Sequence, residues 1–336
     1  MKKKEIPIFF TFDKNYVVAA SVAFFSLLKH ADKRYDYRLF VVHTHLSVKA
    51  QNKLHRVIAR FDNATLTFVD VSTLPLEENI QQGKSHFSKE IYYKLIAADL
   101  FPQYDRILCS DVDVVFTGDI APSYFMYPDE FFYYAGVGQI LASKRMETYG
   151  SNDFQPEELD ILEQEIAAGY LLLNLKAMRQ QKMQQQMSRF YQANYRRLRL
   201  PEQDCMILCC YPHVRHLPME YVVCNTYYRT SSTEAVFYTK NRFLPTDRQE
   251  QQALYDQALQ HPIQLHYVGL DKPWHSFFVP KQRLWFRILK EAGLTGSYLV
   301  AVPSFVRQHL RRYSLKRFIK KMYISLTKAF KLQNHE

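Results

Sequence analysis

The chain has 336 residues, 47% hydrophobic and 23% charged, which is typical of a globular protein with one large domain and an appendage, or two domains. Glycine is scarce, and neither G-x-G-x-x-G nor G-x-x-x-x-G-K occurs, which excludes the common glycine-rich phosphate loops. The five cysteines lack C-x-x-C spacing, which argues against a disulfide framework or zinc site and fits a reducing cytosol. We expect no signal peptide, because the first apolar run stops at Asp13-Lys14 without a small-residue cleavage site. We expect no membrane-spanning helix, because no apolar run reaches about 18 residues.

The net charge of +11 is unevenly distributed. Nine of the 44 basic residues lie after Pro303, together with one of the 33 acidic residues, so the preceding part carries 35 − 32 = +3 and the tail 9 − 1 = +8. This clustering, without a groove-reading motif, argues against a nucleic-acid-binding protein.

Strands and helices alternate in the first part of the chain, which favours parallel β-α-β units. The predicted strands cover 6–12, 37–43 and 64–71, and the predicted helices cover 17–29 and 46–61.

The segment Asp13-Lys-Asn-Tyr16 directly follows the first predicted strand. Loops at this end of a parallel sheet lie over the ligand crevice. Asp13 and Asn15 could therefore bind a base or ribose, and Tyr16 could stack on it. An N-cap for the next helix is an alternative that does not exclude this interpretation.

Two carboxylates follow another buried strand. The apolar run 107–109 leads to Asp111-Val112-Asp113, and a second apolar run follows at 114–116. Side chains at i and i+2 of an extended chain point the same way, so both carboxylates would face the crevice. Such oxygen pairs suit Mg²⁺ or Mn²⁺ shared with a phosphate, although an isolated D-x-D is more often a solvated turn.

Further polar residues accompany later elements. His86 precedes a helix expected over 87–100, which carries Lys94. Glu202, Gln203 and Asp204 open another helix, where they could cap it or line a site. The other predicted elements are an irregular insertion at 130–150, a short helix near Pro156, a buried strand at 166–175, helices at 176–197 and 248–260, short strands and loops around 211–245, and a strand at 263–266.

The last predicted strand ends at His266, which opens the segment His266-Tyr-Val-Gly-Leu-Asp-Lys-Pro-Trp274. Its imidazole could join two carboxylates as a metal ligand, and Lys272 could offer a cation to phosphates. Gly169, within the strand at 166–175, would allow a close approach of backbone or ligand.

Taken in order, these motifs resemble family 8 of the retaining glycosyltransferases, which includes bacterial lipopolysaccharide galactosyl- and glucosyltransferases. The matching segments are Asp13–Tyr16, Tyr92–Leu95, Asp111–Asp113, Ala168–Leu175, Glu202–Asp204 and His266–Trp274. The resemblance implies an α/β, Rossmann-like GT-A fold with a mixed central sheet over 1–275, and a helical basic extension over 276–336.

What the resemblance implies is hexose transfer from a UDP-sugar to a lipopolysaccharide, lipooligosaccharide or related surface glycan. Mn²⁺ or Mg²⁺ would be held by Asp111, Asp113 and His266. The residues implied around the donor are Thr11, Asp13, Asn15, Tyr16, His86, Lys94, Asp111, Val112, Glu202, Gly269 and Lys272.

The catalytic residues implied are Gln203, Asp204 and Lys272. Gln203 matches the amide beneath the anomeric carbon, and Lys272 would stabilise the charge on the leaving UDP. The leaving phosphate could itself take the proton of the acceptor hydroxyl on the same face. The alternative to this mechanism is one in which Asp204 acts as a nucleophile.

Three residues depart from the family pattern. Lys94 stands where many members have Arg, which keeps the charge but loses the bidentate fork. Ala167 replaces an Asn that touches the sugar, and Glu202 replaces an Asp that binds sugar hydroxyls. These last two bear on the sugar, so galactose is favoured and glucose stays open.

The tail after Pro303 predicts an amphipathic helix. One face gathers Leu315, Phe318, Ile319, Met322, Leu326 and Phe330, and the other Lys316, Arg317, Lys320, Lys321, Lys328 and Lys331. This pattern is typical of a helix on an anionic membrane surface, here the inner leaflet of the cytoplasmic membrane, where a lipid-anchored acceptor would lie. A helix docked on the body is the alternative.

Two other functions share part of this pattern. A sugar nucleotidyltransferase would use a similar base loop and carboxylate pair, but the segment from His266 to Trp274 argues against it. A nucleic-acid-binding protein would lose affinity steeply with salt.

Overall fold

The computed structural model describes residues 3–74, 89–138, 149, 154–229, 241–242, 244–276 and 278–312. His86 and the amphipathic face predicted over 315–330 lie outside these residues.

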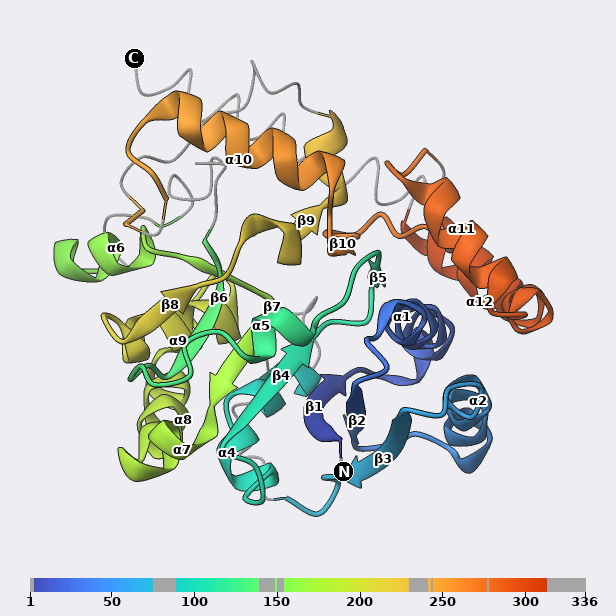
Figure 1. Ribbon diagram of the computed structural model, residues 1–336, viewed down its shortest axis with the longest axis horizontal. Helices are drawn as coiled ribbons and strands as arrows, with labels where there is room; N and C mark the ends of the chain where they lie inside the picture. Colours follow the sequence, from blue (N-terminus) through green and yellow to red (C-terminus); the bar gives the residue numbers. More distant parts are fainter. Residues whose placement is uncertain are drawn as a thin grey trace, which may run out of the picture.

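A seven-stranded sheet with the order β3-β2-β1-β4-β7-β6-β8 forms the centre of the molecule (Figure 1). Strands β1, β2, β3 and β4 run parallel, β7 is antiparallel to both β4 and β6, and β8 is parallel to β6. The predicted α/β fold with a mixed sheet is confirmed. The strands are β1 (Lys4–Thr11), β2 (Tyr35–His43), β3 (Ala64–Asp70), β4 (Arg106–Ser110), β6 (Tyr134–Gly138), β7 (Ile166–Asn174) and β8 (Val214–His216).

A second, three-stranded sheet has the order β5-β10-β9. It consists of β5 (Val114–Phe116), β10 (Gln264–His266) and β9 (Val223–Cys224). In the antiparallel pair of β5 and β10, His266 lies opposite Val114. This register brings a late segment of the chain against the carboxylate pair that follows β4.

Helices cover the sheet (Figure 1). They are α1 (Val17–His30), α2 (Val48–Ile58), α4 (Ala97–Leu100), α5 (Ala121–Tyr124), α6 (Pro156–Leu162), α7 (Leu175–Gln180), α8 (Met183–Asn194), α9 (Pro201–Cys210), α10 (Arg248–Gln260), α11 (Gln282–Glu291) and α12 (Thr295–Arg312), with 3-10 helices η1 (Lys14–Tyr16), η2 (Lys89–Lys94), η4 (Met219–Tyr221) and η5 (Asn225–Arg229).

Three local predictions differ from the structure. The helix expected over 87–100 is divided into η2 and α4, and the helix expected over 176–197 into α7 and α8, with Lys182 in a left-handed conformation between them. Strand β6 lies within 130–150, where an irregular insertion was expected.

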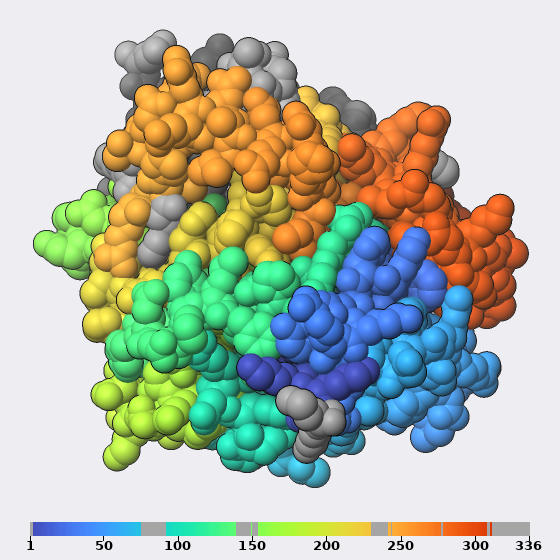
Figure 2. All heavy atoms as spheres, in the orientation of Figure 1, coloured from blue at the N-terminus to red at the C-terminus, as the bar shows by residue number. Residues whose placement is uncertain are grey.

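The helices α11 and α12 pack beside α1, at the edge of the molecule (Figures 1 and 2). Trp285 of α11 and Phe305 of α12 are buried in the same apolar cluster as Ile8 of β1 and Phe24 of α1. The predicted boundary after residue 275 stays a prediction. Within the described part of the chain, none of the helices combines the length and apolar character needed to cross a bilayer.

Candidate active site

The carboxylate pair lies in the short connection between β4 and β5. The backbone N–H of Asp111 donates to the carbonyl of Gly169 on β7, at 3.1 Å. Val112 points the other way, into the core, and is 3% exposed. This alternation leaves Asp111 and Asp113 on one side, as their spacing predicted.

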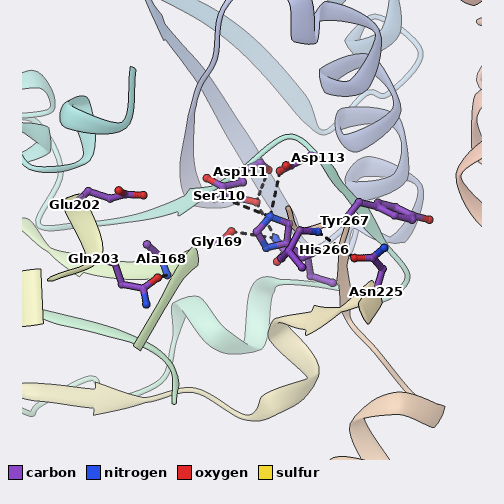
Figure 3. A network of polar contacts seen from close by, with 12 residues as sticks. Ser110, Asp111, Asp113, Ala168, Gly169, Glu202, Gln203, Asn225, His266 and Tyr267 are labelled. Atoms are coloured by element: carbon purple, nitrogen blue, oxygen red, sulfur yellow. Dashed lines mark hydrogen bonds and ion pairs between the residues drawn. The ribbon is translucent and has the colours of Figure 1, made fainter. Parts of the chain in front are cut away.

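His266, at the end of β10, completes a cluster with these carboxylates (Figure 3). Its Nε2 lies 3.6 Å from Oδ2 of Asp111 and 3.2 Å from Oδ1 of Asp113. One ligand atom from each of the three residues lies within 4.8 Å of the others. Two carboxylates and an imidazole form a donor set suited to Mn²⁺.

Gly169 of β7 lies directly beside the imidazole of His266 (Figure 3). A Cβ atom added there would lie 2.6 Å from Nδ1 of His266 and 3.6 Å from Oδ2 of Asp111. The backbone of β7 therefore approaches the imidazole as closely as only glycine permits. This close fit, together with the donor set, is compatible with a bound metal ion.

Lys272 reaches the same cluster from the segment after β10. Its Nζ lies 2.5 Å from Oδ2 of Asp113 and donates to the carbonyl of Tyr267 at 2.6 Å. Burial would raise the pKa of Asp113, but Lys272 and His266 outweigh it and hold this pKa well below its usual range. The carboxylate therefore remains ionised and available as a ligand.

Lys94 is buried behind the carboxylate pair, with 1% of its side chain exposed. Its Nζ donates to Oδ1 of Asp111 at 2.7 Å and to the carbonyl of Ala168 at 2.9 Å. Burial alone would lower the pKa of Lys94, but the carboxylates, Asp111 first among them, raise it above its usual range. This fixed cation orients Asp111.

Glu202, at the start of α9, lies on the other side of Lys94, with 3.9 Å between Oε1 and Nζ. Its Oε2 is buried and has no hydrogen-bond partner among the described residues. Burial raises the pKa of Glu202, against the opposing effect of Lys94. A buried acceptor without a donor can be satisfied by a hydroxyl of a ligand.

Gln203 has a fixed amide orientation. Its Oε1 accepts from the N–H of Ala168 at 3.0 Å, and its Nε2 donates to Oε1 of Glu165. The carbonyl of Glu165 in turn accepts from Nδ2 of Asn241 at 3.3 Å. Sequence analysis did not single out Glu165, because it precedes a buried strand without any motif of its own.

Asp204 is fully buried, and hydrogen bonds hold both of its carboxylate oxygens. Its Oδ1 accepts from the hydroxyl of Tyr149 at 2.7 Å. Its Oδ2 accepts from the N–H groups of Arg199 and Leu200, at 2.7 and 2.9 Å. These bonds satisfy backbone N–H groups ahead of α9, whose N-cap residue, Leu200, makes no side-chain capping bond.

The loop after β1 is stabilised by an N-cap. Asp13 accepts from the N–H of Asn15 at 2.8 Å and from its side-chain amide at 2.9 Å. Tyr16 packs edge-on against Trp274, with 5.7 Å between ring centroids. Burial and then Asp113 raise the pKa of Tyr16 above its usual range. Thr11, half-buried, ends β1.

The backbone of the segment after β10 is held by one glycine and one side-chain hydrogen bond. Gly269 has a φ of +73°, and a Cβ there would meet no atom within 4 Å, so the backbone conformation and not the space favours glycine. Oδ1 of Asn225 accepts from the N–H of Val268 at 3.1 Å. Asn225 was also missed, because nothing in its local sequence distinguishes it from a turn residue.

Comparisons with known proteins agree with this geometry. A family model described as Glycosyl transferase family 8 matches residues 7–277. Among curated proteins, the chain is 22% identical over 273 residues to a lipopolysaccharide 1,2-glucosyltransferase of Escherichia coli, covering 79% of this chain and 72% of that protein.

Two solved structures show the same fold. The WbbM bifunctional glycosyltransferase in its apo form has a TM-score of 0.68 and 21% identity, covering 89% of this chain and 52% of its own, so this chain spans about half of that protein. The galactosyltransferase LgtC, in complex with donor and acceptor sugar analogues, has a TM-score of 0.61 and 19% identity, covering 86% of this chain and 95% of its own.

Proposed function

Because the chain belongs to glycosyl transferase family 8, we propose that it transfers a hexose, galactose or glucose, from a UDP-sugar to a bacterial surface glycan, with retention of configuration. Family members typically use a nucleotide-sugar donor and a divalent metal. The observation that carries the proposal is the cluster of Asp111, Asp113 and His266, flanked by the buried cation of Lys272.

Asp111, Asp113 and His266 would hold Mn²⁺ or Mg²⁺ through two carboxylate oxygens and one imidazole nitrogen. The ion would supply positive charge beside the diphosphate of the donor. Lys272 would add a second positive charge and so stabilise the negative charge that develops on the leaving UDP. Gly269 would let the backbone approach the phosphates. Val112 would contribute backbone only, since its side chain is buried in the core.

Glu202 and Gln203 would position the sugar. The unpaired Oε2 of Glu202 can accept a bond from a sugar hydroxyl. The amide of Gln203, held by Ala168 and Glu165, presents a fixed dipole near the place proposed for the anomeric carbon. Lys94 would keep Asp111 aligned, and Asp13, Asn15, Tyr16 and Thr11 would hold the uridine.

The proposed reaction breaks the bond between the anomeric carbon and the phosphate oxygen, and UDP leaves with the electron pair. The acceptor hydroxyl oxygen bonds to the same face of that carbon, and its proton passes to the leaving phosphate. Asp204 already accepts three hydrogen bonds, which supports a role in holding the start of α9 over one as nucleophile.

The acceptor is proposed to be a saccharide of lipopolysaccharide or lipooligosaccharide, carried by a lipid at the inner face of the cytoplasmic membrane. The E. coli relative, by its name a lipopolysaccharide glucosyltransferase, supports this class. Synthesis of a UDP-sugar from UTP and a sugar phosphate is the second candidate, and its product would be pyrophosphate.

The test is UDP release from a panel of UDP-hexoses with Mn²⁺ and with a chelator. We expect release from one donor, at least about 100-fold slower with chelator or in Asp113→Asn. Asp105→Asn is the matched control, because this carboxylate lies just before β4 and is 71% exposed. Equal rates with Mn²⁺ and chelator would contradict the metal assignment, and pyrophosphate production would favour the second candidate.

A further inference from the structure

An apolar cavity lies next to the proposed active site, between α11, α12 and the segment from Pro273 to Ser276. It encloses about 750 Å³, within the range of about 300–1,000 Å³ typical of ligand pockets. Its walls are mainly aromatic and aliphatic, and include Trp274, Phe286, Val302 and Phe305. The proposed uridine, phosphate and metal residues do not line it.

The cavity continues into an exposed apolar strip on α12. Val306 and Leu310 line the cavity and are nevertheless 49% and 63% exposed. Leu299 lies on the same side of the helix, about two turns before Val306, and is 62% exposed. A large exposed apolar strip that runs into an apolar cavity marks an interaction site rather than ordinary surface.

The segment that forms α11 and α12 is strongly basic in sequence. Residues 278–312 contain a single acid, Glu291, which pairs with Lys29 at 2.6 Å. The basic residues of the same range are Lys281, Arg283, Arg287, Lys290, Arg307, Arg311 and Arg312. An apolar cavity that Arg283 also lines, between helices rich in basic residues, matches the chemistry of an anionic membrane surface.

A second hollow on the other flank of α12 adds to this charge. It measures about 290 Å³ and is lined by Lys14, Lys49 and Lys53. Phe305 lines both this hollow and the apolar cavity, so α12 separates an apolar site from a cationic one. Helix α12 therefore has apolar walls suited to hydrocarbon on one flank, and on the other flank lysines of η1 and α2 that are suited to phosphate.

We propose that the cavity between α11 and α12 binds one hydrocarbon chain of an anionic membrane lipid, while α12 lies on the membrane surface. Trp274 connects this cavity to the proposed donor site, because it lines the cavity and packs against Tyr16. Lys272, two residues earlier, contacts Asp113. A lipid held here brings the membrane surface beside the place of transfer, and its binding does not depend on which sugar is transferred.

The two tryptophans of the chain report on the cavity. Trp274 lines it, and Trp285 lies 5.5 Å from Trp274 between ring centroids. The full chain is mixed with phosphatidylglycerol vesicles whose acyl chains are brominated, and its tryptophan emission is compared with that on unbrominated vesicles. We expect a loss of emission on the brominated phosphatidylglycerol and none with brominated phosphatidylcholine.

A matched pair of variants locates the quenching. Val302→Phe fills the cavity and is expected to abolish quenching while the protein still sediments with the vesicles. Val300→Phe makes the same change at a position that is 79% exposed and outside the cavity, and should quench like the wild type. Near-ultraviolet circular dichroism confirms that both variants are folded.

Several results would overturn the proposal: no quenching of vesicle-bound wild type, equal quenching with phosphatidylcholine, or unchanged quenching in Val302→Phe. Quenching that appears only after removal of residues 313–336 would mean that the protein's own tail takes the cavity. The readout is fluorescence, so a failure here is distinct from a failure to release UDP.

Discussion

At the scale of single residues, Gly169 controls how closely β7 can approach the cluster of Asp111, Asp113 and His266. Because a Cβ would lie 2.6 Å from Nδ1 of His266, Gly169→Ala must displace the imidazole. We expect the affinity for Mn²⁺ to fall about 10–100-fold, as when a neighbouring group misorients a ligand. Calorimetric titration measures this. Gly296→Ala, where a Cβ meets nothing within 4 Å, should bind Mn²⁺ like the wild type.

Glu202 gives a pH-dependent prediction. Its folded-state pKa is raised above the ordinary value of 4.5, so the folded state favours the protonated carboxyl. Above pH 4.5 the unfolded chain releases this proton more readily than the folded protein does. The free energy of unfolding therefore falls as the pH rises from 4.5 through the raised pKa of the folded state. Glu202→Gln should raise the free energy of unfolding at neutral pH, with a difference that disappears in acid. Urea unfolding across pH measures it, and a lower stability of the variant at neutral pH would contradict the burial argument.

The sequence predicted the cluster of Asp111, Asp113 and His266 better than its surroundings. Asp111 and Asp113 lie on one side because of their spacing in extended chain, and the structure brings His266 to them as expected. Metal binding itself stays a prediction. Glu165 and Asn225 could not be found in the same way, because their contacts depend on tertiary packing and not on a local pattern.

At the scale of the secondary-structure elements, Lys182 separates α7 from α8 with φ 51° and ψ 33°. This left-handed conformation costs a residue with a side chain about 1–2 kcal/mol, whereas glycine adopts it freely but loses about 0.5–1 kcal/mol in backbone entropy. Lys182→Gly should therefore stabilise the protein by about 0.5–1 kcal/mol in urea unfolding.

The control for this change is another lysine of the same segment, in the preceding helix. Lys176→Gly, inside α7, should destabilise the protein by about 1 kcal/mol, because there the helix needs an ordinary right-handed residue. Equal effects of the two substitutions would show that the left-handed conformation at Lys182 carries no strain.

The division between α7 and α8 had no signal in the sequence, since lysine is a good helix former and no glycine or proline is nearby. Strand β6 was missed because Gly136 and Gly138 weaken its strand pattern. The strand forms because it lies between β7 and β8, which supply the packing that its own sequence lacks.

At the scale of the whole molecule, the C-terminal helices share the core of the sheet. Trp285 on α11 is 0% exposed and belongs to the same cluster as the residues of β1 and α1. Trp285→Ala should cost about 3–5 kcal/mol, and unfolding should remain a single transition. Differential scanning calorimetry distinguishes this from an early, separate melting of 276–336, which would support an independent C-terminal unit.

The sequence predicted the architecture of the whole molecule only in part. The alternation of strands and helices predicted the parallel half of the sheet, β1 to β3. Nothing in the sequence of β7 shows that it runs antiparallel to β4, because a strand buried on both faces is equally apolar in either direction.

The pairing of β5 with β10 also sets the order in which the site can be assembled during synthesis. Asp111 and His266 are separated by 266 − 111 = 155 positions, and at about 5–20 residues per second a ribosome needs about 8–30 s to cover them. Throughout that interval the growing chain has the two carboxylates without the imidazole. Binding of the proposed metal by all three side chains would therefore be a late event in the life of the nascent polypeptide, after β1, β2 and β3 have been made.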